Sequence, residues 1–297
     1  MSAGVPSPPA HRPGDPVTLL VDGHVHLHRC FPLEAFLERA RANLSSVGRR
    51  LTGSAPWFGV LLFTESAGMD RFGSLARRAG GEWRFGGGWR LEATSEPEAL
   101  VARSPRDEAL VLVAGRQVVT DCRLEVLALG TRSTFRDGEG LHATVERVRS
   151  RGALPVLPWG FGKWWGGRRT LVEEAVEAAP AGSLLLGDNG GRPRGAPEPA
   201  LFQRAREKGI PVLAGSDPLP FPTEIRRVGS YGNLLRTTAF DPHRPVRDVA
   251  TRLAGVDECL EPFGSRSGLL RFAWTQARLR MPAPPKGLRS APVDGPC

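Results

Sequence analysis

The chain has 297 residues, of which 40% are hydrophobic, so it can bury a sizeable core as one large α/β domain or as two smaller ones. Its 40 Lys+Arg against 31 Asp+Glu give a formal net charge of +9, which favours anionic partners. The basic residues occur as scattered pairs without a nucleic-acid motif, so the sequence disfavours direct nucleic-acid binding. No apolar run approaches the roughly 20 residues that span a bilayer, and we expect a cytoplasmic protein without a membrane segment.

The two ends of the chain differ in composition from its middle. Residues 1–16 are rich in Pro, Ser and Ala and lack the basic start and apolar stretch of a secretory signal. Residues 281–297 contain several prolines and no apolar periodicity. We therefore predict disordered segments at 1–16 and 281–297, flanking one domain at 17–280.

Apolar runs and amphipathic segments alternate along the first part of the domain. The pattern predicts strands at Val17–Val21 and Trp57–Thr64, and helices at Leu33–Val47 and about Met69–Ala79. From Trp83 to Gly130, tight polar turns separate short β-prone runs, which indicates a small antiparallel excursion. These runs are Trp89–Ala93, Leu110–Ala114, Gln117–Thr120 and Leu124–Leu129.

Regular alternation then returns and weakens after Gly215. It predicts helices at Leu141–Arg151, Leu171–Ala178, Pro199–Lys208, Val246–Leu253 and Leu269–Arg280, and strands at Leu154–Leu157, Ser183–Gly187 and Pro211–Ala214. Such alternation is typical of a parallel sheet, closed as a (β/α) barrel or left as an open doubly wound sheet. We favour a distorted barrel of about seven strands.

Two imidazoles that are two residues apart, His24 and His26, follow directly on the run Val17–Val21. Alternation along an extended backbone places both side chains on one face, where they can share a cation. The competing interpretation is a solvated, His-rich entry to a loop. His28 lies two residues beyond His26, so it would face the same side, and it is a weaker candidate ligand.

A carboxylate follows the predicted strand Pro211–Ala214. Asp217 ends the small-residue turn Gly215-Ser216-Asp217, and with His24 and His26 it would complete a minimal set of ligands for a divalent metal. The alternative is that Asp217 only caps the turn before Pro218 through backbone amides.

Two longer motifs resemble those of the PHP (polymerase and histidinol phosphatase) superfamily of metal-dependent phosphoesterases. Val21-Asp22-Gly23-His24-Val25-His26 looks like the first metal motif of that family, and the segment Lys208–Asp217 looks like its last. Val113–Val118 is similar to the turn that carries the family's bridging glutamate, and Ser183–Asn189 is similar to a strand that often ends in asparagine. The resemblance implies a PHP-like (β/α) barrel and phosphoester hydrolysis.

The chain departs from the family pattern at several metal ligands. It has Thr64-Glu65-Ser66 where the family has Thr-Asp-His, Gln117 in place of the bridging glutamate, and Pro158-Trp159 in place of His-Pro. Each missing carboxylate or imidazole removes charge or a ligand that a metal cluster needs. We therefore expect one divalent ion (Zn, Mn or Fe) on His24, His26 and Asp217, with Gln117 or Glu65 as an additional ligand.

The glycine- and tryptophan-rich segment Pro158–Arg169 offers cations for an anionic substrate. Lys163 and Arg168 could clamp an anion at the barrel mouth, or the segment could be an aromatic lid whose basic residues are merely solvated. Asn189 is a further candidate contact for the substrate. Asp188 is a candidate base, although Asp-Asn-Gly-Gly is also a good turn sequence.

These residues favour a single-metal hydrolase, phosphoesterase-like, that acts on a small anionic substrate. Glu65 or Asp188 would relay the proton, and Lys163, Arg168 and Asn189 would orient the substrate. One alternative is a catalytically inactive PHP-like binding protein, which the missing ligands favour. Another is an amidohydrolase-like enzyme that cleaves C–N bonds.

Overall fold

The computed structural model describes residues 15–53, 55–79, 83–238, 240–255 and 260–280. The predicted disordered tail, 281–297, lies outside the described residues, as do residues 1–14 of the predicted N-terminal segment. Within the described residues, no helix has both the length and the apolar character that a membrane span requires.

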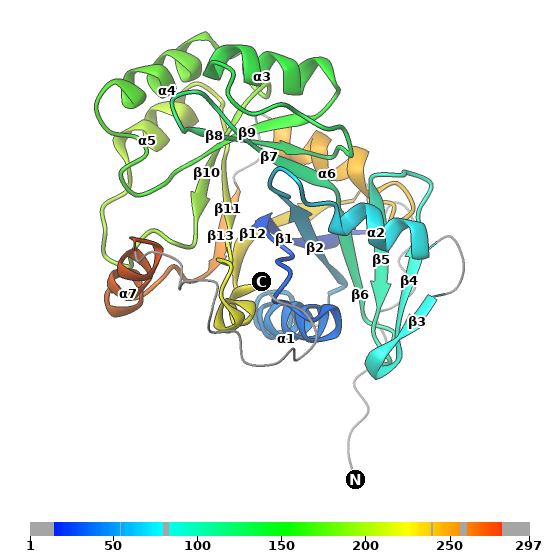
Figure 1. The fold of residues 1–297 in the computed structure, drawn as a ribbon. Coiled ribbons are helices and arrows are strands. Elements are labelled where there is room, and N and C mark those ends of the chain that lie inside the picture. Colours follow the sequence, from blue (N-terminus) through cyan, green and yellow to red (C-terminus); the bar gives the residue numbers. More distant parts are fainter. Residues whose placement is uncertain (1–14, 54, 80–82, 239, 256–259, 281–297) are drawn as a thin grey trace.

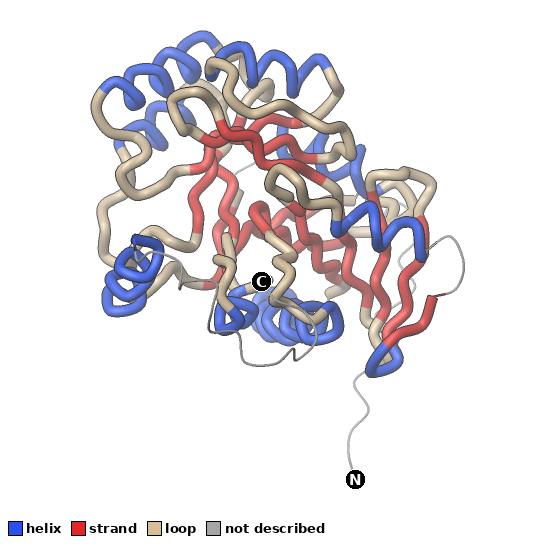
Figure 2. Tube along the Cα trace, in the orientation of Figure 1, coloured by secondary structure: helices blue, strands red, loops and turns tan. Residues whose placement is uncertain are grey.

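The strands form two sheets (Figures 1 and 2). The eight-stranded sheet has the order β13 (Glu261–Gly264), β12 (Tyr231–Thr237), β1 (Val17–Val25), β2 (Trp57–Phe63), β6 (Ala109–Val113), β5 (Ala99–Arg103), β4 (Trp89–Ala93) and β3 (Trp83–Phe85). The five-stranded sheet has the order β11 (Val212–Gly215), β10 (Leu185–Asn189), β9 (Leu154–Pro158), β8 (Glu125–Leu129) and β7 (Gly115–Val119).

The predicted seven-stranded PHP-like barrel is wrong. Among the strands of the described residues, only β1, β2 and β6 in one sheet and β9, β10 and β11 in the other pair in parallel, and β12 runs antiparallel to β1. The segment from Trp83 to Gly130 also contributes antiparallel strands to both sheets, β3 to β6 in the first and β7 and β8 in the second. These antiparallel pairs interrupt the continuous parallel array that a (β/α) barrel requires.

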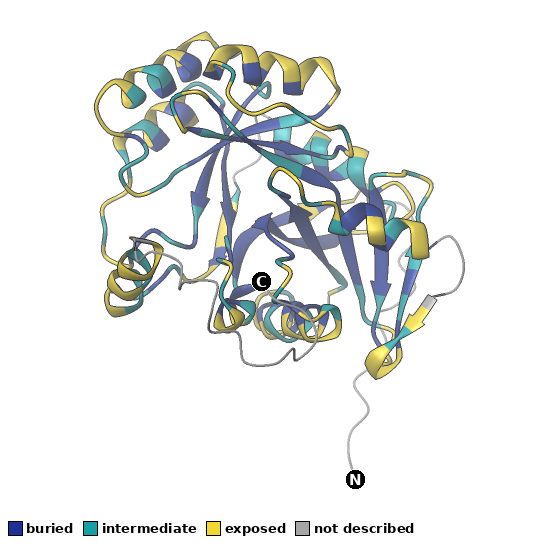
Figure 3. Ribbon diagram, in the orientation of Figure 1, coloured by how far each residue is buried: buried dark blue, intermediate teal, exposed yellow. Residues whose placement is uncertain are grey.

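Helices cover the outer faces of both sheets (Figure 1). Helices α1 (Leu33–Thr52) and α2 (Arg71–Arg78) pack on the eight-stranded sheet, and helices α3 (Leu141–Ser150), α4 (Gly167–Ala178) and α5 (Ala200–Glu207) pack on the five-stranded sheet. A separate apolar cluster fills the space between the sheets and includes side chains of α6 (Pro245–Ala254). Figure 3 shows most of the strands in both sheets as buried.

Glycines let the two sheets approach each other closely beside β1. A Cβ atom on Gly215, in β11, would lie 2.4 Å from the backbone nitrogen of His24, and one on Gly23 would lie 2.4 Å from Cγ of Leu213. Real Cβ atoms do not come this close to other heavy atoms, so a larger residue would push β1 and β11 apart.

We predict that Gly215→Ala lowers the free energy of unfolding by about 1–3 kcal/mol, because the added methyl group overpacks the contact between β1 and β11. Gly167→Ala is the matched control, since a Cβ at the first residue of α4 meets no atom within 4 Å. The control should leave stability unchanged or slightly higher. Urea denaturation measures both, and equal effects would contradict the close approach.

Candidate metal centre

A β-bulge in β1 turns the two histidines toward the interior. The four residues from Asp22 to Val25 in β1 lie opposite the three residues from Leu61 to Phe63 in β2, so β1 carries one extra residue there. Before the bulge, Leu19 and Val21 face the space between the sheets. After it, Val25 faces the helix-side core, which places His24 and His26 on the opposite, interior side.

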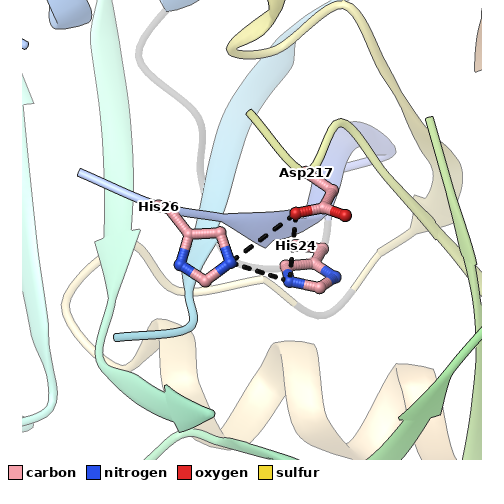
Figure 4. A group of neighbouring side chains, drawn as sticks. All are labelled: His24, His26 and Asp217. Atoms are coloured by element: carbon pink, nitrogen blue, oxygen red, sulfur yellow. Dashed lines mark hydrogen bonds and ion pairs between the residues drawn. The ribbon is translucent and has the colours of Figure 1, made fainter. Parts of the chain in front are cut away.

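The structure brings His24, His26 and Asp217 together (Figure 4). The two Nε2 atoms lie 3.0 Å apart, and Asp217 Oδ1 lies 3.6 Å from each of them. One candidate ligand atom from each of the three side chains lies within 4.8 Å of the others. Both histidines are buried, and Asp217 comes from the loop that follows β11.

The donor atoms fit a divalent cation. Tetrahedral zinc with ligands at about 2.1 Å separates neighbouring donor atoms by about 3.4 Å, close to the three distances seen here. Two imidazole nitrogens and one carboxylate oxygen are also a ligand set that Zn, Mn and Fe accept. Water and substrate would supply the remaining ligands.

The protonation states of His26 and Asp217 also suit a divalent cation. Burial, followed by the influence of His24, lowers the pKa of His26 to about 3, so this imidazole is neutral and its nitrogen lone pair is available. Burial raises the pKa of Asp217, but His24, His26, Arg227 and Lys163 together lower it, and its net pKa lies below the usual value. Asp217 therefore supplies an ionised oxygen.

Hydrogen bonds fix the orientation of Asp217. Its backbone nitrogen donates to the carbonyl oxygen of His24 (2.8 Å), and its φ of 45° lies in the left-handed region that non-glycine residues rarely adopt. Asn189 Nδ2 donates to Asp217 Oδ2 (3.0 Å) and also to the carbonyl oxygen of Trp159 (2.7 Å). Because Asn189 engages Oδ2, Oδ1 is left to face the histidines.

Asp22 holds together the backbone segments that carry the site, a role that was not identified from the sequence. Its carboxylate is fully buried and accepts hydrogen bonds from the backbone N–H groups of Ser216 (2.7 Å), Gly229 (2.9 Å) and His24 (3.4 Å). Burial raises its pKa to about 6, against the effect of these hydrogen bonds. The signal in the sequence was an aspartate placed directly before the Gly-His step.

His28, the weaker candidate ligand, contacts the site at its edge. Its ring stacks on His26 at a centroid distance of 5.2 Å, and its Nε2 lies 2.8 Å from the carbonyl oxygen of Pro218. Because Nε2 pairs with this carbonyl, His28 holds the loop that carries Asp217.

A cavity of about 360 Å³ opens beside His26 and Asp217. Among the predicted site residues, its lining includes His26, Asp217, Gln117, Lys163 and Asn189. Its apolar walls include Trp159, Phe161, Leu219, Phe272 and Leu279, the last two from α7 (Leu269–Arg280).

Glu125 lines this cavity too and was not identified from the sequence. It forms a short ion pair with Lys163 Nζ, and Gln117 Nε2 donates to its Oε1 (3.1 Å). Lys163 therefore reaches the cavity as part of a neutral pair. The carboxylate begins β8, inside the antiparallel segment from which Gln117 was the predicted ligand.

Glu65 is placed in a different cavity, beside Arg116. Its Oε1 accepts the backbone N–H of Phe72 at the start of α2 (2.9 Å), and its Oε2 accepts Arg116 Nη1 (3.1 Å). Burial raises the pKa of Glu65. These contacts join α2 to β7, and a catalytic role for Glu65 stays a prediction from the sequence.

Asp188 points away from the metal centre, because it precedes Asn189 on β10 and consecutive strand residues face opposite sides. Its carboxylate accepts two hydrogen bonds from Arg192 (2.8 and 2.6 Å) and one from the Tyr231 hydroxyl (2.8 Å). Its catalytic role likewise stays a prediction.

Arg168 does not line the cavity at His26. Its Nη2 donates to the carbonyl oxygen of Gly162 (2.7 Å), which closes the glycine-rich loop on itself. In the same loop, Trp164 is buried against Phe202. A different arginine, Arg227, is buried in the cavity wall, and the sequence analysis did not single it out.

No protein-family model matches the sequence, and no curated protein matches it. Solved structures with distant similarity include PsfC from Pseudomonas syringae PB-5123, which is 12% identical with a TM-score of 0.49 over 90% of this chain and 98% of that chain. They also include the lesion-specific endonuclease PfuEndoQ from Pyrococcus furiosus, 11% identical with a TM-score of 0.46 over 82% of this chain and 56% of that chain. At these TM-scores, neither likeness assigns an activity to this chain.

We predict that Asp22→Ala lowers the free energy of unfolding by about 3–5 kcal/mol, because buried backbone N–H groups lose their acceptor. Asp22→Asn keeps one acceptor oxygen and should cost less. Chemical denaturation of both variants measures the difference. A loss below about 1 kcal/mol for Asp22→Ala would contradict this role.

Proposed function

We propose that this protein is a metal-dependent hydrolase of the phosphoesterase type, with one divalent ion held by His24, His26 and Asp217. The observation that carries the proposal is the convergence of two imidazole nitrogens and a carboxylate oxygen, within 4.8 Å of one another, beside a cavity. The motifs that resemble the PHP superfamily contain these same three residues, which supports phosphoester hydrolysis as the reaction.

The ion, the residues that position its ligands and the cavity would each contribute separately to the reaction. A divalent cation supplies Lewis acidity, which polarises a phosphoryl oxygen and promotes the ionisation of water. Asn189 holds Asp217 so that Oδ1 faces the two histidines. The cavity volume, about 360 Å³, suits a small molecule.

We assign the handling of the proton to Glu125, because this carboxylate lines the cavity at His26, whereas Glu65 and Asp188 line other cavities. Glu125 is held by Lys163 and Gln117. Gln117 lies beside the centre and is available there as an additional neutral contact for the substrate or the ion.

We predict that protein purified without chelator contains about one Zn, Mn or Fe ion per chain. His24→Ala and His26→Ala should each reduce this content to background, because each removes one of three ligands. Elemental analysis of the purified proteins measures it directly.

The matched control for these variants is His142→Ala, since His142 is an exposed residue on α3 and lies away from the centre. It should keep the metal content of the natural protein. Natural protein without metal, even after incubation with these ions, would contradict the proposal and favour the inactive binding protein. Metal-loaded protein that cleaves cyclic amides but no phosphomonoester would favour the amidohydrolase-like alternative.

A second prediction concerns Asn189 as a positioning residue. Asn189→Ala frees the Asp217 carboxylate to rotate, so we expect metal affinity to fall by about 10–100-fold while the fold is retained. Competition with a chromogenic chelator measures the affinity. Asn189→Asp, which replaces the donor with an acceptor, should be at least as harmful as Asn189→Ala.

A further inference from the structure

Arg227 ends the short 3-10 helix η2 (Pro222–Arg227), which follows the loop that carries Asp217. The residue is only 8% exposed, yet it lines the cavity beside Asp217, Asn189 and Ser267. A charged side chain is rarely buried to this extent without a partner for each of its polar groups.

The guanidinium of Arg227 has such a partner on one side. Its Nη1 donates to Ser267 Oγ (2.6 Å), whereas its Nη2 is buried and has no hydrogen-bond partner among the described residues. Gly190 makes room for this group, because a Cβ there would lie 1.9 Å from Nη2. A buried N–H donor without an acceptor is costly, and more so when it is charged.

The neighbouring acids do not supply the missing acceptor. Glu224, on the same 3-10 helix, forms its short ion pair with Arg271. Asp217 attracts Arg227 electrostatically, but Asn189 engages its Oδ2 and its Oδ1 faces the histidines. Lys163 has its counter-ion in Glu125, whereas Arg227 lines the same cavity without an ion-pair partner among the described residues.

From this arrangement we infer that Arg227 binds an anionic oxygen group of the substrate, a phosphate or a carboxylate, next to the metal centre. An arginine fork pairs with such a group through charge-assisted hydrogen bonds, and the Ser267 hydroxyl, which accepts from Nη1, can donate its own hydrogen to the same group. The inference rests on the proposed function in one respect, that this anionic group belongs to the molecule hydrolysed there.

The test uses inorganic phosphate as the probe and follows thermal unfolding of the purified full chain. Phosphate should stabilise the natural protein, and Arg227→Met should abolish the stabilisation, with affinity reduced by about 10–100-fold. Because Arg227→Met removes a buried, incompletely paired charge, it should also raise the melting temperature without phosphate. A purely structural role would lower that temperature.

The matched control is Arg226→Met, which removes the same charge from the exposed neighbouring position. It should retain the full response to phosphate. A response that survives in Arg227→Met, or no response in the natural protein, would overturn the inference. If Arg227→Met does not fold, Arg227→Lys decides: affinity reduced by about tenfold supports the inference, and unchanged affinity overturns it.

Two further measurements separate the sources of the signal. Acetate in place of phosphate distinguishes the two anions, and a stronger Arg227-dependent response to one of them identifies a carboxylate or a phosphate as the bound group. Metal analysis of Arg227→Met separates this inference from the proposed function. Unchanged metal with lost phosphate binding supports both, whereas metal-free natural protein with Arg227-dependent phosphate binding contradicts the proposed function alone.

Discussion

The Asp22 carboxylate ties together three segments that are far apart in the chain. It accepts N–H groups from β1 itself, from Ser216 after β11 and from Gly229 before β12. Ser216 is adjacent to Asp217, and Gly229 is two residues beyond Arg227. One buried anion therefore sets the positions of the histidine strand, the candidate carboxylate ligand and the arginine of the cavity wall, and three backbone donors offset part of its desolvation cost.

The charges around the cavity together favour an anionic substrate. The His26 imidazole is neutral, Asp217 is ionised, and Arg227 is buried with one side unpaired. In the proposed state, a divalent ion added to these groups leaves an excess of positive charge at the cavity. A doubly charged phosphate ester would balance that excess, which is consistent with the strongly basic composition of the whole chain.

Most helices and strands could be predicted because the spacing of apolar residues over a short stretch of sequence distinguishes a helix from a strand. The strand Val17–Val21 and the helix Leu33–Val47 exist, although both extend further, to Val25 and Thr52. β12 was missed because Gly232 and Asn233 interrupt its apolar pattern, and its antiparallel pairing with β1 depends on residues over 200 positions away. The barrel prediction failed for that reason, since strand direction is a property of pairing.

The sequence indicated the parts of the candidate site that depend on residue type and local position, and it missed the parts that depend on contacts between distant segments. His24, His26 and Asp217 could be proposed because residue type and position at a strand end both pointed to a cation. Glu65 and Asp188 were proposed on the same basis, but their partners, Arg116 and Arg192, are known only from the fold. Arg227 carries no signal in the sequence, because its burial and its unpaired nitrogen arise from tertiary packing.

The extra residue in β1 makes the chemistry of this chain depend on strand geometry as well as on composition. Leu20 and Val25 both lie on the helix side of β1 only because one additional residue between them breaks the regular alternation. In a regular strand of the same sequence, His24 and His26 would face the same side as Leu20, and both imidazoles would point into the apolar packing against α1. A homologue could thus retain every histidine of the motif and still have lost the centre, so the register of β1 against β2 is the character to follow when the evolutionary gain or loss of the centre is traced.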